Sequence, residues 1–558
     1  MDLFSRILAA KHITPENRAA FLSPDYDNRH DPFLLPDMQA AVDRIKTARE
    51  KQEKITIYGD YDIDGLTATT VLLEGLKSFG FEQVDAFIPN RFVEGYGLTV
   101  DAVERIAAMG AQLIITVDCG SLSHEPIARA NELGVDIVVT DHHNVADVQP
   151  DAVAVVNPKR LLHDFPEKYE NFLLKEKSNT LYPFVDLAGV GVAFKLVQAL
   201  STKLAGLEDG KEKWLMDLVA LGTVCDVVTL RDENRTFVYW GLKVLAKTRR
   251  PGLKALMLVS GVEPEKVNAR SLGFQLGPRM NAAGRLETAQ YALDMLMTQD
   301  SFVALEKAQQ LDTMNKQRRA DQDKIFKEAI VEAEQRLSDP VLVVSAPGWS
   351  HGIIGIVAAK LLERYKKPTY VLEVMGEEAK GSARSYGDFS AADAIRFSDD
   401  IITKGGGHKL AAGVTMPAAN IDAFRKRVNE FYVSLKLSNQ TDLLLPQADS
   451  DATFDELNEQ LVRDLEALEP FGSGNKQPVV KTANLIVAGI RRMGAEGQHV
   501  KLELQDGSGK KLQFLAFNAP AHYFAEPGEM VTAWYTVDIN EWQGRRTVEG
   551  MLLHLEIL

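Results

Sequence analysis

The stretch ITIYGDYDIDG, from Ile55 to Gly65, is a short β-rich run followed by three aspartates at alternate positions, Asp60, Asp62 and Asp64. The residues that follow, LTATTVLLEGLKSF, have the pattern of a helix, so the acids lie where a strand gives way to a helix. Like charges this close together repel one another unless a cation lies among them. The stretch therefore predicts a strand-to-helix junction that binds metal.

Short β-rich runs alternate with helical stretches from Lys54 to Pro158, and this pattern predicts a parallel α/β sheet. The runs are ITIYG, VDAFIP, QLIITV, VDIVVT and AVAVV. Asp118 follows the third run, and Asp141, His142 and His143 follow the fourth. Because the carboxyl ends of parallel strands line one crevice, we expect these side chains to meet the three aspartates there.

Carboxylates and imidazoles together are ligands for divalent cations, and imidazole shifts the preference from Mg²⁺ toward Mn²⁺. Five carboxylates and two histidines could hold two ions, which would hydrolyse a phosphate ester through an activated water. Taken singly, each acid could instead be a turn or helix cap, and Gly65 could simply permit a tight bend. The coincidence at three strand ends favours the metal site.

The rest of the chain predicts several further domains, since 558 residues exceed one compact core. Helical periodicity extends from Leu187 to about Lys247, and residues 301–338, which lack Gly and Pro, predict one or two long connecting helices. A smaller α/β pattern follows, and many short β-rich runs near the end predict a small β-barrel. The expected divisions are an N-terminal segment 1–45, a catalytic domain 46–247, a helical and connector segment 248–338, a smaller α/β domain 339–437, and a barrel 438–558.

Composition sets limits on location and on partners. No apolar stretch approaches the roughly 20 residues that span a bilayer, and Cys119 and Cys225 are too few for a disulfide framework, so we expect a cytoplasmic protein without a membrane. The net charge of -15 argues against a protein that coats nucleic acid nonspecifically. It leaves open an enzyme that holds one strand in a local basic groove.

Four runs in this order resemble the motifs of the DHH phosphoesterase family: YGDYDIDG, VDCG at Val117, TDHH at Thr140 and GTVCDVV at Gly222. Within it, the likeness is to the RecJ group of exonucleases, and it covers nearly the whole chain. The further motifs are PNRFVEGYGL, LAGVGVAFKL, GPRMNAAGRL, GSARS, GGGHKLAAG and EPFGSGNKQP. The resemblance implies a DHH domain joined by a long helix to a smaller DHH-associated domain, with a C-terminal barrel of the OB type.

The resemblance also implies site residues. The metal ligands would be Asp60, Asp62, Asp64, Asp118, His142 and Asp226. His143 would lie close to the scissile phosphate, and His143, Asp62 and Asp118 would be catalytic, with Asp118 as the bridging ligand. Asp226 rests on the resemblance, because an acid after an apolar helical run is by default a capping or solvated residue. Ile63, Cys119 and Cys225 depart from the usual pattern, but the ligands beside them are intact.

The same resemblance implies contacts to the DNA backbone and its terminal phosphate. These fall on Arg91, Tyr96, Arg279, Asn281, Arg285, Ser382, Arg384, Gly407 and His408. Arginine suits this role because its planar fork grips phosphate, and glycine lets backbone amides approach it. Two alternatives remain open: His408 could be a surface residue of a flexible loop, and Tyr96 could be a half-buried tyrosine rather than a stacking platform.

The implied function is 5′-to-3′ exonuclease activity on single-stranded DNA, which releases 5′-mononucleotides in DNA repair and recombination. It implies two ions, Mn²⁺ or Mg²⁺, a monomer, and helicases and single-strand-binding proteins as partners. One alternative is a DHH phosphodiesterase for cyclic dinucleotides or very short RNAs, whose members usually lack the barrel. Another is a noncatalytic DHH scaffold, although such proteins lose metal ligands.

Overall fold

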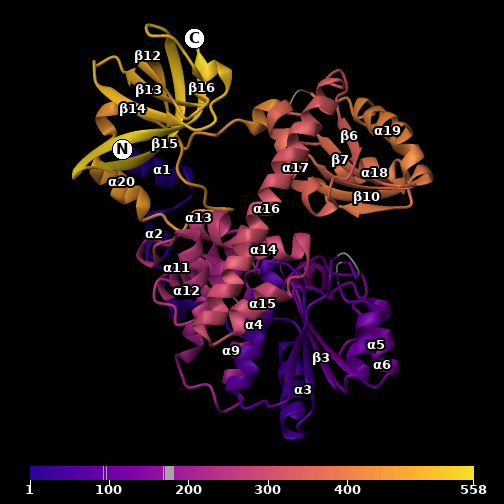
Figure 1. Ribbon diagram of the computed structural model, residues 1–558. Helices are drawn as coiled ribbons and strands as arrows, with labels where there is room; N and C mark the ends of the chain where they lie inside the picture. Colours follow the sequence, from indigo (N-terminus) through magenta and orange to yellow (C-terminus); the bar gives the residue numbers. More distant parts are fainter. Residues whose placement is uncertain (92–93, 96, 168, 170–180, 439) are drawn as a thin grey trace. The chain divides into compact units, whose positions relative to one another are not determined.

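The computed structural model describes residues 1–91, 94–95, 97–167, 169, 181–438 and 440–558 (Figure 1). The chain divides into two compact units, one formed mainly by residues 8–315 and the other mainly by residues 316–462 and 478–558. Most of the stretch 166–182, which the sequence predicts to be a surface loop, lies outside the described residues.

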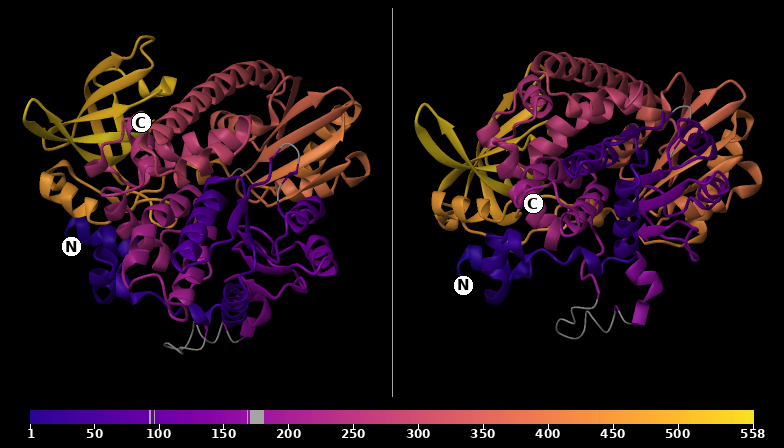
Figure 2. Two further views of the ribbon diagram at one scale, coloured as in Figure 1. Left: turned by 60° about the horizontal axis from the view of Figure 1, so that its bottom comes forward. Right: turned by 90° about the horizontal axis from the view of Figure 1, so that it is seen from below.

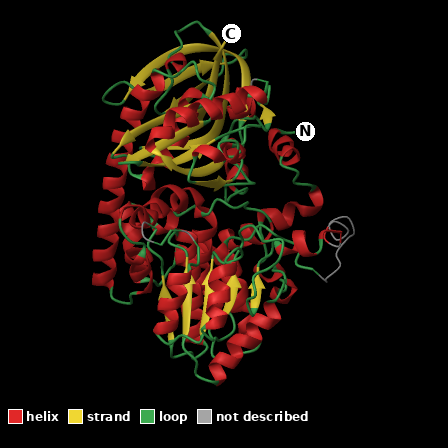
Figure 3. Ribbon diagram, turned by 90° about the vertical axis from the view of Figure 1, so that its right-hand side faces the viewer, coloured by secondary structure: helices red, strands yellow, loops and turns green. Residues whose placement is uncertain are grey.

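The first unit contains a five-stranded sheet in the order β2-β1-β3-β4-β5. All its pairings are parallel, and the strands run in one direction in Figure 3. The strands are β1 (Ile55–Gly59), β2 (Val84–Phe87), β3 (Leu113–Val117), β4 (Asp136–Thr140) and β5 (Ala154–Val156). This sheet confirms the predicted parallel α/β fold, with each of the five β-rich runs forming a strand.

Helices cover both faces of this sheet. On one face, α5 (Val100–Ala108) and α6 (His124–Glu132) bury Ile106 and Ile127 against Ile114 and Val139 (Figure 1). On the other, α3 (Met38–Glu50), α4 (Ile63–Ser78) and α9 (Gly189–Ser201) contribute to the main core. Strands buried on both sides are expected to be almost continuously apolar, and ITIYG and LIITV each contain one threonine in an otherwise apolar run. Because α3 continues across residue 45, the predicted N-terminal segment ends inside a helix.

Most of the remaining helices of this unit belong to the same core. They include α7 (Arg160–Asp164), α10 (Met216–Cys225), α11 (Asp232–Leu245), α12 (Pro251–Ser260), α14 (Gly277–Leu286) and α15 (Gln290–Met297). Near the N-terminus, α1 (Leu3–Ala10) and α2 (Pro15–Leu22) contribute no residue to this core. The connector predicted as one or two helices is one helix, α16 (Ser301–Glu334), seen without interruption in Figure 2. The boundary between the two units falls within it.

The second unit contains two sheets. One has the order β6-β7-β8-β10-β9, and its only parallel pairing within the described residues is β6 with β7. Its elements are β6 (Leu342–Pro347), α17 (His351–Tyr365), β7 (Thr369–Met375), β8 (Glu378–Arg384), α18 (Ala391–Arg396), β9 (Lys404–Gly407), β10 (Ala411–Pro417) and α19 (Ile421–Ser434). This is the predicted smaller α/β domain.

The other sheet closes into a barrel, because β12 pairs with β13 on one side and with β15 on the other. Its elements are β11 (Ser450–Asp451), α20 (Glu459–Glu466), β12 (Val480–Met493), β13 (His499–Gln505), β14 (Lys511–Ala516), β15 (Met530–Trp542) and β16 (Arg545–Ile557). The parallel pairing of β14 with β16 completes a five-stranded barrel of the OB type. The predicted barrel is confirmed.

No helix among the described residues combines the length and the apolar character that crossing a membrane requires.

Candidate metal centre

The turn between β1 and α4 is built so that its three aspartates point into one site. Asp62 is the N-cap of α4, and its Oδ1 accepts hydrogen bonds from the backbone amides of Asp64 at 2.9 Å and Gly65 at 3.1 Å. A Cβ on Gly65 would lie 2.5 Å from the carbonyl oxygen of Asp60, so only glycine fits there. The sequence DYDIDG therefore specifies this turn as well as its ligands.

Asp64 is fully buried and is held by the beginning of another helix. The amides of Gly189 and Val190, in the first turn of α9, donate to its two carboxylate oxygens at 2.6 and 2.9 Å. A helix N-terminus favours negative charge, so α9 stabilises this carboxylate. Gly222 of α10 provides space on the other side, because a Cβ there would lie 2.9 Å from Asp64 Oδ1.

Asp118 follows β3 directly and takes a left-handed backbone conformation, with φ of 61°. Its amide donates to the carbonyl of Thr140 at 3.0 Å, which ties it to the neighbouring strand end. A Cβ on Gly189 would lie 2.7 Å from Asp118 Cβ, so the glycine that starts α9 also makes room for this ligand. The aspartate's unusual conformation is the kind of local strain that functional sites retain.

His142 brings the strand ends together. Its Nε2 lies 3.1 Å from Asp118 Oδ1, 3.6 Å from Asp226 Oδ2 and 3.8 Å from Asp64 Oδ2. Burial and the neighbouring His143 lower its pKa to about 3, so the ring is neutral at physiological pH. A neutral imidazole is the form that binds a metal ion.

Asp141 holds both histidines in place. Its Oδ1 accepts from the amides of His142 and His143 and from His143 Nδ1 at 2.9 Å, while its Oδ2 accepts from the amide of Ser121. Burial would raise the pKa of Asp141, but the hydrogen bond from His143 and the two imidazoles hold it below its usual range. Conversely, burial would lower the pKa of His143, but Asp141 raises it. The sequence predicts Asp141 as a possible ligand, yet these contacts make it a positioning residue.

Asp226 caps the end of α10, where the sequence alone suggested only a capping or solvated acid. Its side chain is about one-fifth exposed, at 21%. Burial, together with Asp64 and Asp62, raises its pKa to about 9. The same causes act elsewhere in the cluster. Burial and Asp62 raise the pKa of Asp60 to about 8 and the pKa of Asp64 to about 7. Burial and the surrounding aspartates raise the pKa of Asp118 strongly.

The cluster lacks partners that a folded protein would normally supply. Four buried atoms of the cluster have no hydrogen-bond partner among the described residues: Asp60 Oδ1, Asp118 Oδ1, His142 Nε2 and Asp226 Oδ2. Among the described residues, no lysine or arginine forms an ion pair with the five clustered aspartates. Buried carboxylates of this kind are stable when they coordinate a cation. The donor set therefore fits divalent metal ions.

Three ligand groups can be drawn from atoms within 4.8 Å of one another. They are Asp60, Asp62 and Asp118; Asp64, His142 and Asp226; and Asp118, His142 and His143. Asp118 and His142 each occur in two groups, so neighbouring ions could share them. All seven predicted metal-binding or catalytic residues thus converge in one place.

The predicted substrate residues of this unit lie in two settings. Arg91 lies 5.3 Å from the ring centroid of Tyr61, and both Arg91 and Arg285 lower the raised pKa of that tyrosine, so two cations flank the turn that carries the aspartates. Asn281 instead accepts a hydrogen bond from the amide of Ile63 at 3.0 Å, which fixes the same turn. Arg279 is paired with Asp312 at 2.8 Å. Tyr96 lies outside the described residues.

The other predicted contacts come together on the sheet of the smaller α/β domain. Ser382 and Arg384 lie on β8, and Gly413 of β10 pairs with Ser382 on one side and with Gly406 on the other. GGGHKLAAG is not simply a flexible loop: Gly407 ends β9, with φ of 138°, and His408 begins the exposed turn to β10, its amide bonded to the carbonyl of Ala411. Ser382, Arg384, Gly407 and His408 thus belong to one sheet region.

Sequence reasoning missed the residues that support the ligands. Gly189 and Val190 hold Asp64, and the signal was the small-residue start of LAGVGVAFKL. Asn281, which the resemblance assigns to the DNA, has a further role in fixing the aspartate turn. In the barrel, Phe514 is buried in the core, Trp534 is half-buried, and Phe517 and Trp542 are exposed.

Three family models match the chain in order: the DHH family, N-terminal domain, over residues 54–223; the DHHA1 domain over 338–434; and the RecJ OB domain over 448–554. With the carboxylate and imidazole cluster, they define the class of protein as a DHH phosphoesterase. The single-stranded-DNA-specific exonuclease RecJ of Bacillus subtilis (strain 168) is 38% identical over 97% of this chain, which spans 66% of that relative. That of Salmonella typhimurium is 33% identical, with coverage of 92% of this chain and 89% of the relative.

The crystal structure of RecJ in complex with Mn²⁺ from Thermus thermophilus has the same architecture. It matches with a TM-score of 0.80 and 29% identity over 99% of this chain and 77% of that chain. The chain belongs to the RecJ family of DHH phosphoesterases.

Proposed function

We propose that this chain is a 5′-to-3′ exonuclease that hydrolyses single-stranded DNA to 5′-mononucleotides with two divalent cations, Mn²⁺ or Mg²⁺. The observation that carries the proposal is the set of four buried ligand atoms without partners, Asp60 Oδ1, Asp118 Oδ1, His142 Nε2 and Asp226 Oδ2. The similarity to RecJ exonucleases and the closed barrel argue against the alternative of a short-substrate phosphodiesterase. The intact ligand set argues against a noncatalytic scaffold.

The proposed ligands are Asp60, Asp62, Asp64, Asp118, His142 and Asp226. Two bound cations would lower the pKa of a water molecule and stabilise charge on the phosphate in the transition state. Asp118 would link two of the three ligand groups, the one with Asp60 and Asp62 and the one with the two histidines, since it belongs to both. Asp62 would orient its neighbours as well, because its carboxylate fixes the first turn of α4.

His143 would contact the scissile phosphate. Its Nδ1 lies 2.9 Å from Asp141 Oδ1, a contact that fixes the direction of the ring. The ring is 41% exposed, in contrast to His142, which makes it accessible to a substrate. Asp141 would act through His143 by fixing the direction of the ring.

The DNA backbone would be held by the remaining predicted residues. Arg91 and Arg285 flank the aspartate turn, and Ser382, Arg384, Gly407 and His408 offer donors on the smaller domain, where Arg384 is half-buried but His408 is exposed. Arg279, Asn281 and Tyr96 remain part of the proposal, although Arg279 and Asn281 also have internal partners. None of these contacts reads a base edge, which suits a sequence-independent nuclease.

The proposal extends to a monomeric enzyme in the cytoplasm that works with helicases and single-strand-binding proteins in DNA repair and recombination. It is supported by substrate chemistry: a nuclease confined to single strands needs another protein to separate the duplex and to keep the strands apart.

The test uses a 5′-labelled single strand and the matching duplex, each incubated with Mn²⁺, Mg²⁺ or a chelator. We expect release of a labelled mononucleotide from the single strand only, and only with metal. Asp62→Ala should abolish the release, and Asp101→Ala, which removes a carboxylate that is 74% exposed on α5, should not. Undiminished activity of Asp62→Ala, or release of label in chelator, would refute the proposed site.

A further inference from the structure

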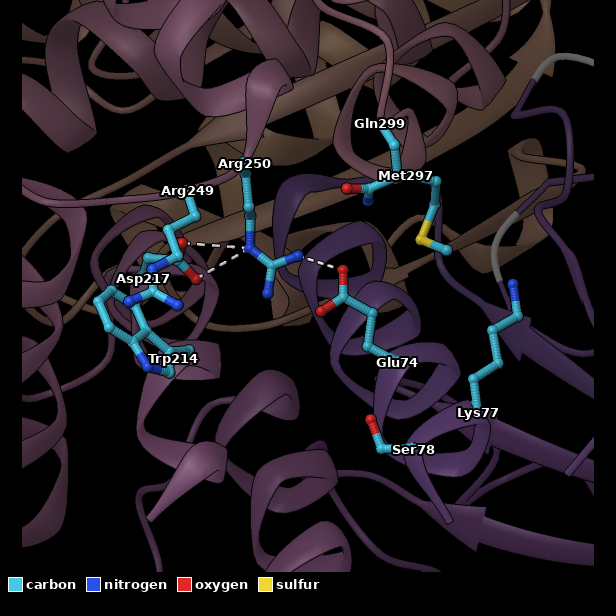
Figure 4. Close-up of a pocket in the computed structure, with 9 residues that line it drawn as sticks. All are labelled: Glu74, Lys77, Ser78, Trp214, Asp217, Arg249, Arg250, Met297 and Gln299. Atoms are coloured by element: carbon cyan, nitrogen blue, oxygen red, sulfur yellow. Dashed lines mark hydrogen bonds and ion pairs between the residues drawn. The ribbon is translucent and has the colours of Figure 1, made fainter. Parts of the chain in front are cut away.

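The helices α4 and α10 border a polar hollow at the ends that lie away from the metal centre (Figure 4). It is about 480 Å³ in volume, within the roughly 300–1,000 Å³ typical of small-molecule sites. Glu74, which lines the hollow, follows the metal-centre residue Asp64 by ten positions on α4. At the rise of an α-helix this corresponds to about 15 Å along the axis. It is therefore distinct from the proposed catalytic site.

A buried arginine points into this hollow with one nitrogen still available. Arg250 Nε donates to both oxygens of Asp217 at 3.1 Å, and its Nη1 pairs with Glu74. The side chain is only 10% exposed, yet Nη2 has no protein partner among the described residues and is directed between Glu74 and Trp214 in Figure 4. A buried guanidinium with a free donor is a preformed contact for an oxyanion.

Two more cations border the hollow without carboxylate partners. Neither Lys77 nor Arg249 forms an ion pair among the described residues, and they lie on opposite sides of the hollow in Figure 4. With Arg250 they give three positive charges against the two negative charges of Glu74 and Asp217. On a chain with a net charge of -15, this is a local site for an anion.

The hollow also contains a flat aromatic surface. Trp214 is 37% exposed, and the guanidinium of Arg249 lies 4.1 Å from its ring centroid. Tryptophan and arginine planes both stack on nucleobases, and stacking is tolerant of base identity. An anion that carries an aromatic ring fits these groups better than phosphate alone.

We propose that this hollow binds a nucleoside 5′-monophosphate, with its phosphate on Arg250 Nη2 and Arg249 and its base against Trp214, while Lys77 adds positive charge from the opposite side. The ligand could be a free mononucleotide or the 5′-terminal nucleotide of a strand, because both present the same phosphate and base. The choice of this ligand rests on the proposed function, since mononucleotides are the product class of that reaction. The site itself rests on the hollow, its cations and its indole.

The test measures binding of deoxyadenosine 5′-monophosphate to the full chain by calorimetry. Chelator and the Asp226→Asn substitution prevent phosphate from binding at the metal centre, so the result does not depend on hydrolysis. We expect saturable binding in the micromolar to millimolar range, at least tenfold weaker in Lys77→Ala/Arg249→Ala. The control Arg396→Ala/Lys426→Ala removes the same charge from exposed positions of the smaller domain and should leave affinity unchanged.

Two further comparisons identify the ligand. Trp214→Ala should weaken nucleotide binding but not phosphate binding, and Trp214→Phe should restore it. A 5′-phosphorylated oligonucleotide that binds more tightly than the mononucleotide, with the same dependence on Lys77 and Arg249, would identify the strand end as the source. Equal affinity for inorganic phosphate and the nucleotide, no saturation at about 10 mM, or indifference to Lys77→Ala/Arg249→Ala would overturn the proposal.

Discussion

The two ends of the helix pair α4 and α10 each bring together buried carboxylates, but they balance the charge differently. The helices run in opposite directions: Gly222, near the end of α10, packs on Thr67 near the start of α4, and Asp217 and Glu74 meet at the other end. At that end Arg250 lies between the two acids. At the metal end, Asp62, Asp64 and Asp226 have no such cation among the described residues.

This contrast teaches how an external cation is specified. Burial raises the pKa of Asp217 too, but there Arg250 opposes the rise, whereas at Asp226 and Asp64 neighbouring carboxylates add to it and the cluster has orphaned oxygens. The side chains of the protein thus balance the charge at one end of the helix pair α4 and α10 but not at the other. Bound divalent cations would supply the positive charge that is missing at the metal end.

The largest expected effect comes from removing one carboxylate at the metal end. Asp226→Asn should lower kcat/KM for single-stranded DNA by about 1,000-fold or more, a change of about 4 kcal/mol in transition-state stabilisation. Without metal, the same variant should be more stable than the parent, because a neutral amide avoids the cost of keeping a carboxyl protonated beside Asp64 and Asp62. Nuclease assays and thermal unfolding in chelator measure both. A less stable metal-free variant would contradict the comparison.

At the other end, Arg250→Ala should destabilise the fold by about 3–5 kcal/mol, because it leaves Asp217 buried without its guanidinium. Urea unfolding followed by hydrogen exchange in α4 and α10 would locate the loss. Arg396→Ala, at a position 66% exposed, is the matched control and should change stability by less than about 0.5 kcal/mol. A loss below about 1 kcal/mol for Arg250→Ala would mean that Asp217 does not need this partner.

A smaller effect is expected from the support of the histidines. Asp141→Asn keeps the size of the side chain but weakens its hold on His143, and it should reduce kcat by roughly 10- to 100-fold. Because the ligands remain, the affinity for Mn²⁺ should fall less than in Asp226→Asn. Metal titrations of activity separate the two variants. Equal losses of Mn²⁺ affinity would place Asp141 among the ligands.

The smallest effect concerns pH. The pKa values of Asp60, Asp64 and Asp226 are raised to about 8, 7 and 9, so the metal-free folded protein keeps protons that the unfolded chain has already lost. Its stability therefore falls as pH rises from about 4 toward 9, whereas ion binding, which needs ionised carboxylates, strengthens. The Tm difference between Mn²⁺ and chelator should widen by at least about 2 °C from about pH 5.5 to about pH 8.5. A constant difference would show that these carboxyls are ionised without metal.

Much of this site could be predicted from the sequence because its ligands follow strands at the carboxyl edge of a parallel sheet. Asp60, Asp118 and His142 were placed by strand periodicity alone, and the structure brings them together. Asp226 could not be found in this way, since it ends a helix that is remote in sequence and reaches the site only through the packing of α10 on α4. Asp141 was a candidate ligand by position, and only its hydrogen bonds reveal its supporting role.

By itself, the sequence determined the order of strands and helices, the glycine-bearing turn and the kind of atoms offered to metal, because these depend on local periodicity and residue chemistry. Only the tertiary structure decided which carboxylates remain without a partner. Charge balance in a protein interior depends on which side chains meet across elements. At one end of α4 and α10, the packing brings Arg250 to Glu74 and Asp217. At the other end, no lysine or arginine among the described residues pairs with the aspartates.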